Sequence, residues 1–510
     1  MNRYPTDISA DPYDWVSSVV AADPTRPAIR TPDGRSLSYA ALDAGAARFA
    51  AAIASLGVEP QDRVLVQAEK SVEFVLLYLA CLRMGAIFVP INTSYTDAEV
   101  AYFISDSDPK LIVTTQPRAA ATRAMAGSAA VETLGQQQDG SLAALAAGTT
   151  AAVPPRPAPD AGRLAAFLYT SGTTGRPKGA MLTCGNFTSN AAVLAQEWRF
   201  TKDDVLLHAL PLFHAHGLFV AVNTSLMAGA SFILMPKFDA AEVLRLLPGA
   251  SVFMGVPTFY TRLLAEAGLD RSSTASIRLF VSGSAPLLAE THTAFSARTG
   301  HAILERYGMT ETLMNTSNPH DGERRPGTVG PPLPGTEIRI TDPDTAAPLQ
   351  QGAIGMIEVR GPNVFKGYWR NPEKTAADLR DNGFFITGDL GLIDADGYVH
   401  IVGRGKDLII SGGYNIYPRE IESELDQLPG VDESAVIGVP DADFGEAVVA
   451  VIVAKPGASL DTAELAAALQ PRLARFKQPR HYVIMAELPR NAMGKVMKAE
   501  LRANWQPPTR

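Results

Sequence analysis

The sequence predicts an α/β protein with largely parallel sheets and more than one domain. Short apolar runs of strand length alternate with longer amphipathic stretches, which is typical of parallel sheets covered by helices. The length of 510 residues exceeds what one hydrophobic core normally supports. A glycine-flanked segment, 403-GRGK-406, separates a large N-terminal part from a shorter C-terminal part. We therefore expect a large N-terminal domain with parallel-rich sheets and a small α+β C-terminal domain.

Apolar runs and helical spacing locate elements in both parts. Strands of the N-terminal part are expected at 63–69, 110–115, 231–236 and 278–284, and helices at 71–84 and 286–299. In the C-terminal part, strands are expected at 408–410, 434–439 and 447–454, and helices at 418–428 and 461–474. These elements alternate in the order that a parallel-rich sheet requires.

Two stretches fit this pattern less well. Residues 118–162 are rich in alanine and proline, and we expect them to form a surface connector. Residues 205–236 carry no charge, which superficially suggests a membrane span. Three histidines, Asn223 and two prolines interrupt the stretch, so we expect buried strands and loops around an active site.

Composition excludes several classes of partner. The 45 basic and 53 acidic residues give a formal net charge of -8, which offers no basic field for nucleic acid or an anionic membrane. The two cysteines, Cys81 and Cys184, are far apart and fit a reducing compartment. The first twenty residues lack an apolar signal segment, so a cytoplasmic location is expected.

The most informative stretch is 164-LAAFLYTSGTTGRPKG-179, in which an apolar strand leads into a loop rich in hydroxyls and glycines. Glycines allow successive backbone N–H groups to face one concavity, and hydroxyls and a lysine add donors, so the loop suits a polyphosphate. It is not a Walker A loop, because residues 179–181 continue as a second strand. The expected phosphate contacts are Thr170, Ser171, Gly172, Thr173, Thr174, Gly175 and Lys178.

This loop resembles the signature of the adenylate-forming superfamily, which includes acyl-CoA synthetases, and four further motifs of that superfamily follow in order. They are 307-YGMTE-311, 387-TGD-389, 403-GRGKDLIISGGYNIYPREIE-422 and 489-PRNAMGK-495. The resemblance covers essentially the whole chain. It implies an ATP- and Mg²⁺-dependent enzyme that joins a carboxylic acid to coenzyme A through an acyl-AMP intermediate.

The resemblance also implies roles for particular residues. Asp389 and Arg404 would hold the ribose, Tyr307 would stack on adenine, and Glu311 with Thr170 would bind Mg²⁺. Further nucleotide contacts are expected from Gly283, Ser284, Ala285, Glu305, Arg306, Gly308 and Thr310. Catalytic roles are expected for Lys495, Lys178, Thr310 and His214. Lys495 would stabilise the charge that develops between the substrate carboxylate and the α-phosphate.

Two half-reactions imply a moving C-terminal domain. The resemblance places the domains at 1–403 and 407–510, with residues 404–406 as a hinge and Lys406 as its pivot. Rotation would withdraw Lys495 and bring Gly412 and Gly413 to the site, where they would leave room for the pantetheine arm of coenzyme A.

Within the superfamily, residues 211–219, 254–264, 282–287 and 305–319 resemble malonyl-CoA synthetases. A second carboxylate needs its own positive partner in a buried pocket. Arg262, on a helix opened by Pro257, is the first candidate and Arg306 is the second. Other expected substrate contacts are His214, Ser282 and Met309. His214 and His216 lack the further ligands that a metal site would need, so His214 is interpreted as a pocket wall or gate.

Alternative functions remain open at this stage. A short-chain monocarboxylate–CoA ligase belongs to the same class. A stand-alone adenylation module that loads a carrier-protein thiol and a catalytically silent nucleotide sensor belong to other classes. Malonate–CoA ligation, with methylmalonate as a possible second substrate, is the leading hypothesis, and all the expected partners are small molecules.

Overall fold

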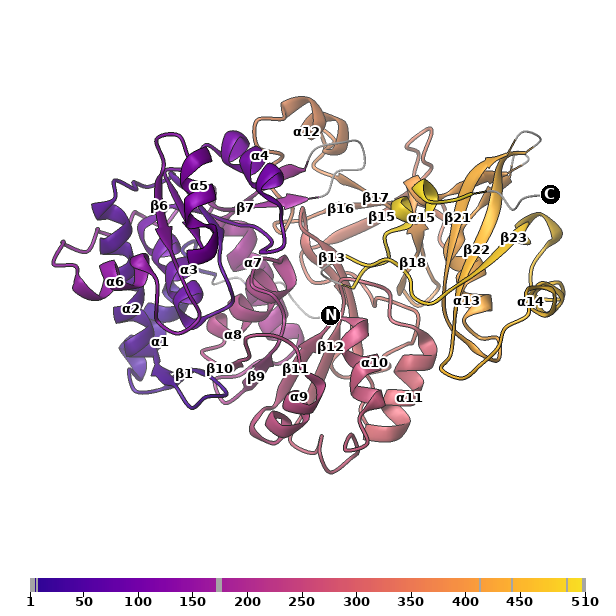
Figure 1. Ribbon diagram of the computed structural model, residues 1–510, viewed down its shortest axis with the longest axis horizontal. Coiled ribbons are helices and arrows are strands. Elements are labelled where there is room, and N and C mark those ends of the chain that lie inside the picture. The colour runs from indigo at the N-terminus through magenta and orange to yellow at the C-terminus, as the bar shows by residue number, and fades with distance from the viewer. Residues whose placement is uncertain are drawn as a thin grey trace.

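The computed structural model describes residue 5 and residues 8–170, 177–411, 414–441, 444–491 and 494–506. The N-terminal elements form a large body, and the elements from β19 onward form a smaller body beside it (Figure 1). This arrangement confirms the predicted fold class of a large domain with parallel-rich sheets and a small α+β domain.

The first sheet of the large body has six strands. Their order is β6 (Ala130–Thr133), β5 (Leu111–Thr114), β3 (Arg63–Gln67), β4 (Ile87–Pro90), β7 (Leu164–Thr170) and β8 (Lys178–Thr183). All neighbours pair in parallel except β7 and β8, which pair antiparallel with Thr170 opposite Lys178. The expected phosphate loop therefore connects two paired strands at one end of this sheet.

The second sheet has eight strands and a mostly parallel centre. Their order is β14 (Leu313–Ser317), β13 (Leu304–Met309), β12 (Leu279–Ser282), β11 (Val252–Gly255), β9 (Val205–His208), β10 (Ser231–Leu234), β1 (Pro27–Arg30) and β2 (Ser36–Ser38). Only the two outer pairs, β13 with β14 and β1 with β2, are antiparallel. The carboxyl ends of β9, β11, β12 and β13 consequently lie along one edge, where ligands bind in such sheets.

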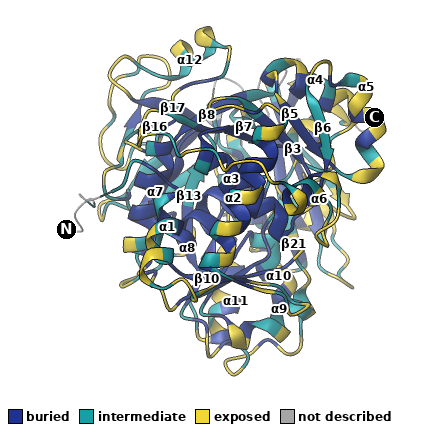
Figure 2. Ribbon diagram, turned by 90° about the vertical axis from the view of Figure 1, so that its left-hand side faces the viewer, coloured by how far each residue is buried: buried dark blue, intermediate teal, exposed yellow. Residues whose placement is uncertain are grey.

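Helices pack on and between these sheets. The described helices of the large body are α1 (Asp14–Ala22), α2 (Tyr39–Ser55), α3 (Val72–Met84), α4 (Asp97–Ser107), α5 (Ala119–Met125), α6 (Ser141–Gly148), α7 (Cys184–Glu197), α8 (Asn223–Met227), α9 (Ala240–Leu246), α10 (Pro257–Ala265), α11 (Ala289–Thr299), α12 (Pro372–Asp378) and the π-helical segment η2 (His216–Val222). Helix α3 is buried along almost its whole length (Figure 2). It begins at Ser71, whose hydroxyl accepts from the Phe74 N–H, and ends at Gly85 with φ +76°.

A four-stranded antiparallel sheet completes the large body. It consists of β15 (Glu337–Thr341), β16 (Gly355–Arg360), β17 (Phe385–Ile393) and β18 (Val399–Arg404). β18 ends at Arg404, and the short 3-10 turn η4 (Gly405–Asp407) leads to the small body. The boundary between the expected domains thus falls where this sheet ends.

The small body is a mixed sheet with helices. Its elements are β19 (Ile409–Ser411), β20 (Tyr414–Ile416), α13 (Pro418–Leu425), β21 (Val431–Asp441), β22 (Gly445–Ala454), α14 (Thr462–Leu469), β23 (His481–Met485) and α15 (Lys498–Ala503). Strands β21 and β22 pair antiparallel over their length, and β23 adds to β22 in parallel. The strands and helices expected from the sequence are all present, with shifted ends.

Two expectations for the large body were wrong. Residues 118–162 are not only a connector, because β6 extends the six-stranded sheet and α6 packs on α2. Residues 205–236 contain η2 and α8 between β9 and β10, where strands and loops were expected. A short, wholly apolar run has no polar face, so its periodicity does not separate a buried helix from a strand. Within the described residues, no helix is long and apolar enough to cross a bilayer.

Gly330 gives a direct test of backbone packing. Its φ is +79°, and a Cβ atom there would lie 2.1 Å from the Ser317 carbonyl carbon. Gly352 has a similar φ of +84° but open space around it. We expect Gly330→Ala to lower the free energy of unfolding by about 3 kcal/mol or more, and Gly352→Ala by only about 1 kcal/mol. Thermal unfolding midpoints measure both, and equal shifts would contradict this packing.

Candidate active site

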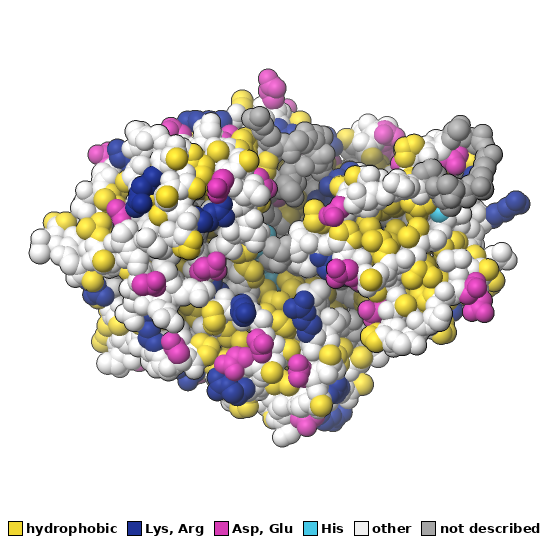
Figure 3. Space-filling model, in the orientation of Figure 1, with side chains coloured by type: hydrophobic (Ala, Val, Ile, Leu, Met, Phe, Trp, Pro, Cys, Tyr) yellow, Lys and Arg dark blue, Asp and Glu magenta, His cyan; other side chains and the backbone are white. Residues whose placement is uncertain are grey.

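The expected site residues gather where the two bodies meet. Figure 3 shows a hollow between the bodies on this face of the molecule. The large body contributes the ends of β7, β12, β13, β17 and β18, and the small body contributes the segment that leads to Lys495. The site is therefore built from segments that are far apart in the sequence.

Tyr307, Asp389 and Arg404 form one connected group. The Tyr307 hydroxyl donates to Asp389 Oδ2 at 2.5 Å, and Arg404 Nε lies 2.7 Å from Asp389 Oδ1. The antiparallel register of β17 and β18 sets Asp389 opposite Arg404. Burial and the Asp389 charge raise the pKa of Tyr307, and the same charge raises the pKa of Arg404. Both carboxylate oxygens of Asp389 are thus in contact with a donor, and a ribose would have to share them.

Glu311 is buried near Thr170, the last described residue before the expected phosphate loop. Its Oε1 accepts from the Tyr368 hydroxyl at 3.1 Å. Burial raises the pKa of the Glu311 carboxyl, while hydrogen bonds from Tyr368 and Thr170 lower it. Lys178 Nζ lies 5.9 Å from the centre of the Tyr368 ring. A single buried carboxylate with hydroxyl neighbours is the protein side of a typical Mg²⁺–polyphosphate site, so these residues fit the expected ion.

Lys495 reaches this site from the small body. Its ammonium stands in the electric field of Arg404, Asp389 and Lys406, although its side chain is exposed. Partial desolvation, followed by the positive charge of Arg404, lowers the pKa of Lys495 to about 8. The preceding Gly494 packs against Thr258 of α10. The structure therefore brings Lys495 together with the ribose-binding candidates.

Arg306, the second candidate for the distal carboxylate, is buried on β13. It is only 3% exposed, and its Nε and Nη2 have no hydrogen-bond partner among the described residues. Glu305 precedes it on β13 and therefore points to the opposite face of the sheet, where its Oε1 accepts from the Leu287 N–H at 3.0 Å. Burial lowers the pKa of Arg306 to about 9. A guanidinium remains charged in proteins, so the pocket holds an uncompensated positive charge.

Three neighbours share the surroundings of this guanidinium. A Cβ atom on Gly283 would lie 2.4 Å from Arg306 Cζ, so only glycine leaves room for the group. His216 Nδ1 lies 3.2 Å from Ser284 Oγ, and Ser284 holds a left-handed φ of +72°. Burial and the charge of Arg306 lower the pKa of His216 far below its usual range. His216 Nε2 and Ser282 Oγ are also buried without a partner in the described part of the chain.

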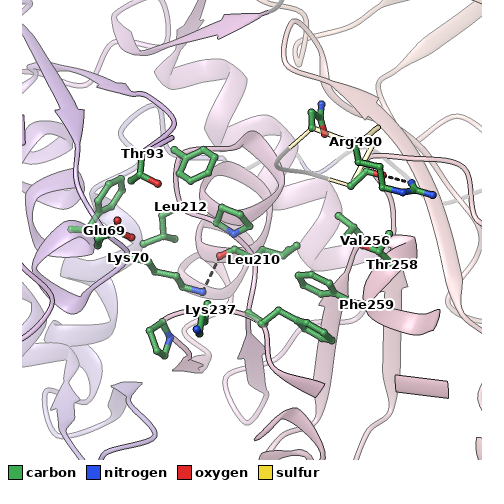
Figure 4. A pocket seen from close by; sticks show the side chains of 18 of the residues that line it. Glu69, Lys70, Thr93, Leu210, Leu212, Lys237, Val256, Thr258, Phe259 and Arg490 are labelled. Atoms are coloured by element: carbon green, nitrogen blue, oxygen red, sulfur yellow. Dashed lines mark hydrogen bonds between the residues drawn. The ribbon is translucent and has the colours of Figure 1, made fainter. Parts of the chain in front are cut away.

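Arg262 does not share this environment. It is exposed in the last turn of α10, at the rim of a cavity of about 410 Å³ whose other lining residues include Lys70, Lys237 and Phe259 (Figure 4). The hypothesis for Arg262 assumed a guanidinium shielded from water. Arg262 is exposed, so this assumption does not hold. The structure instead favours the second candidate, Arg306.

The other predicted site residues lie near these groups or outside the residues that the structure describes. Ala285, Gly308, Met309 and Thr310 are half-buried at the ends of β12 and β13, and Lys406 is exposed in η4. His214 is half-buried against Phe213, and burial lowers its pKa to about 4. Ser171, Gly172, Thr173, Thr174, Gly175, Gly412 and Gly413 lie outside the described residues.

Sequence reasoning missed two participants. Tyr368 holds Glu311, but a tyrosine in a loop carries no signal of that role. His216 was considered only as half of a possible metal pair. Its run, 211-PLFHAHGLF-219, already contributed to the resemblance, so the signal for a pocket residue was present in the sequence.

Comparisons with known proteins agree with this geometry. The family described as AMP-binding enzyme matches residues 16–369, and the family described as AMP-binding enzyme C-terminal domain matches residues 420–495. The malonate–CoA ligase of Arabidopsis thaliana is 35% identical over 93% of this chain and 85% of its own length. A feruloyl-CoA synthase of an Amycolatopsis species is 38% identical over 92% of this chain and 94% of its own.

Solved structures are more similar still. The crystal structure of ATP-bound MatB from Rhodopseudomonas palustris is 55% identical, covers 97% of this chain and 99% of its own, and has a TM-score of 0.95. The apo structure of the same protein has equal identity and coverage but a TM-score of 0.85. The overall arrangement of this chain is therefore nearer to that of the ATP-bound structure.

Asp389→Asn tests the ribose-binding group. The amide keeps one oxygen acceptor but removes the charge that pairs with Arg404 and the second acceptor that a ribose diol needs. A charge-assisted hydrogen bond contributes about 1.5–3 kcal/mol, so we expect the dissociation constant of a non-hydrolysable ATP analogue to rise about 10- to 100-fold. Asp396→Asn in the β17–β18 turn removes only an exposed pair with Arg325 and is the matched control. Calorimetric titration that gave equal affinities for both variants would contradict the assignment.

Proposed function

This chain belongs to the AMP-binding enzyme family, and we propose that it uses ATP to ligate malonate to coenzyme A through malonyl-AMP. The buried, unpaired guanidinium of Arg306 carries this proposal. An unpaired charge in a buried site is strongly unfavourable, and a second carboxylate on the substrate would relieve it. A monocarboxylate would leave Arg306 without a partner.

The donors around Arg306 suit a carboxylate in kind and in number. In the tautomer whose Nδ1 accepts from the Ser284 hydroxyl, the ring hydrogen of His216 is on Nε2, where it is free to be donated. With Arg306 Nε and Nη2, this gives at least three N–H groups for two carboxylate oxygens. The Ser282 hydroxyl is a fourth donor. Neutral His216 adds a hydrogen bond without adding repulsion to Arg306.

The other carboxylate of malonate is the one that reacts. Its oxygen attacks the α-phosphorus of ATP, the bond between that phosphorus and the bridging oxygen breaks, and pyrophosphate leaves. Two anions must approach each other in this step, so the positive charges of Lys495 and Lys178 lower its barrier. Mg²⁺, held by Glu311 and Thr170, would neutralise phosphate charge. Asp389 and Arg404 would fix the ribose and so the line of attack.

The second half-reaction requires a different set of residues. The thiol of coenzyme A attacks the acyl carbonyl of malonyl-AMP, and AMP leaves. We propose that the small body turns about residues 404–406, which withdraws Lys495 and admits the pantetheine arm past Gly412 and Gly413. The present arrangement, with Lys495 beside Arg404, corresponds to the first half-reaction. The reaction is proposed for the cytoplasm, a reducing compartment in which the free thiols of Cys81 and Cys184 would persist.

Short-chain monocarboxylates are the alternative substrates. A relative named as a feruloyl-CoA synthase is as similar in sequence as the one named as a malonate ligase, so overall identity does not choose between acids. The chemistry of the pocket does, because an apolar acyl tail would meet Arg306. A stand-alone module that loads a carrier protein would need the same first half-reaction and no free coenzyme A.

Arg306→Met is the decisive variant for the acid. It removes the charge and keeps an unbranched side chain in the buried site. Loss of one partner of a desolvated pair costs about 3–5 kcal/mol, so kcat/KM for malonate should fall by about two to four orders of magnitude. Propionate, in which a methyl group replaces the distal carboxylate, should become an equal or better substrate. A pyrophosphate-release assay with both acids measures the ratio.

Arg262→Met is the matched control for the same assay. Because Arg262 is exposed, we expect its loss to change the malonate-to-propionate ratio by less than about threefold. If Arg306→Met lowered kcat/KM equally for both acids and Arg262→Met lowered it for malonate alone, the distal carboxylate would bind at α10 instead.

The lowered pKa of Lys495 gives a pH prediction. Its ammonium form is the active one, and that form is lost as the pH rises through about 8. Malonyl-AMP formation, measured as kcat/KM for ATP, should therefore fall above this pH. Lys495→Arg keeps the charge at high pH, so the lower kcat/KM of this variant should stay constant as the pH rises. An unchanged alkaline limb in Lys495→Arg would assign the titration to another group.

A further inference from the structure

Lys70 is a buried lysine that no step of the proposed reaction uses. It lies immediately before α3, between the end of β3 and the Ser71 cap, and is 8% exposed. Its Nζ donates to His208 Nδ1 at 2.8 Å, to the His208 carbonyl at 2.8 Å and to the Leu210 carbonyl at 2.9 Å. Figure 4 shows the side chain reaching Leu210. Burial lowers the pKa of Lys70 well below its usual range, and these three acceptors match the three donors that the ammonium form offers.

His208 connects Lys70 to the start of η2 through a second hydrogen bond. The Gly217 carbonyl only accepts, so the neutral His208 ring carries its hydrogen on Nε2 and its Nδ1 accepts from Lys70. Nε2 lies 2.7 Å from the Gly217 carbonyl and donates to it. Burial and the neighbouring charge of Lys70 keep the pKa of His208 far below its usual range, so the ring is neutral. The start of α3, the end of β9 and the first turn of η2 are thus joined by one chain of hydrogen bonds.

Gly217 shows how closely this segment is packed. A Cβ atom there would lie 1.9 Å from the Pro211 carbonyl oxygen. The His208–Gly217 hydrogen bond and the close approach of Gly217 to the Pro211 carbonyl oxygen therefore hold the two ends of the loop 209–216 together. His216 is the last residue of this loop and the first of η2, so its ring position follows from the closure.

We propose that Lys70 is a positioning residue for the acyl pocket, which holds His216 against Ser284 and Arg306 through His208 and Gly217. The proposal rests on the proposed function, because it assumes that the distal carboxylate of malonate binds beside Arg306. Lys70 touches no substrate in this arrangement. It fixes the geometry of a donor that does, and a displacement of about 1 Å in such a group can cost about 100-fold in rate.

Lys70→Met tests the proposal in the full-length enzyme. We expect kcat/KM for malonate to fall about 10- to 100-fold, mostly through KM, because a displaced His216 weakens binding of the distal carboxylate. The KM for ATP and kcat/KM for propionate should change by less than about threefold. Lys237→Met removes an exposed lysine from the rim of the same cavity and should leave all these values unchanged. Equal losses for malonate and propionate in Lys70→Met would overturn the proposal.

A second variant separates positioning from folding. Lys70→Met leaves three buried acceptors without a donor, which lowers stability. Lys70→Met combined with His208→Leu removes the ring acceptor as well, so its thermal midpoint should recover part of the loss. Malonate selectivity should not recover, because the double variant also removes the His208 Nε2 donor of the Gly217 carbonyl. Recovery of selectivity together with stability would reduce Lys70 to a structural residue.

Hydrogen exchange distinguishes this proposal from the proposed function. In Lys70→Met, amides of residues 209–222 should exchange faster, whereas those of β21 and β22 should not change. If the unmodified enzyme showed no preference for malonate over propionate, the proposed function would fail, and exchange alone would then decide the role of Lys70. Unchanged exchange in residues 209–222 would overturn the positioning role whatever the acid.

Discussion

An unpaired guanidinium in a buried pocket is the constraint on which the acyl site depends. Burying an ion costs several kcal/mol unless a partner of opposite charge is present. Arg306 Nε and Nη2 have no hydrogen-bond partner among the described residues, and the charge of Glu305 acts on Arg306 without a direct ion pair, so a ligand anion would add the missing contact. In the proposed function, selectivity for a dicarboxylate would follow from these unpaired donors, which a monocarboxylate would leave without a partner.

The surrounding fold keeps Arg306 unpaired while the substrate is absent. The alternation of β13 turns the Glu305 carboxylate away, toward the Leu287 N–H. Gly283 leaves space for the guanidinium, and the bulk of any other side chain would displace it. Burial and the charge of Arg306 keep His216 neutral, which avoids a second cation in the pocket. Glu305 therefore makes no hydrogen bond to Arg306, Gly283 leaves the guanidinium in place, and neutral His216 adds no second charge.

The sequence predicted the fold class, because that depends on local patterns of strands and helices, and the local motifs led to a hypothesis for the nucleotide-binding group. It placed Asp389 and Arg404 together, and the register of β17 and β18 agrees. It ranked Arg262 above Arg306, because spacing along a helix does not reveal which side chain the sheets will bury. Tyr368 and Lys70 act through contacts with residues more than 50 positions away, Glu311 and His208, and leave no local pattern. β6 was missed because its run is short and flanked by alanine-rich helices.

In the proposed reaction, the two cations that would serve malonate stand on different parts of the chain. Arg306 is on a strand inside the large body, whereas Lys495 is on a loop of the small body. The distal carboxylate must remain bound through both half-reactions, so its partner belongs on the rigid element. The reacting carboxylate loses its need for Lys495 once malonyl-AMP has formed. Arg404 and Lys406 repel Lys495, and bound polyphosphate offsets that repulsion. In the proposed two-step reaction, departure of pyrophosphate would remove the offset, so the same charges that assist the first half-reaction would then favour withdrawal of Lys495 before the second.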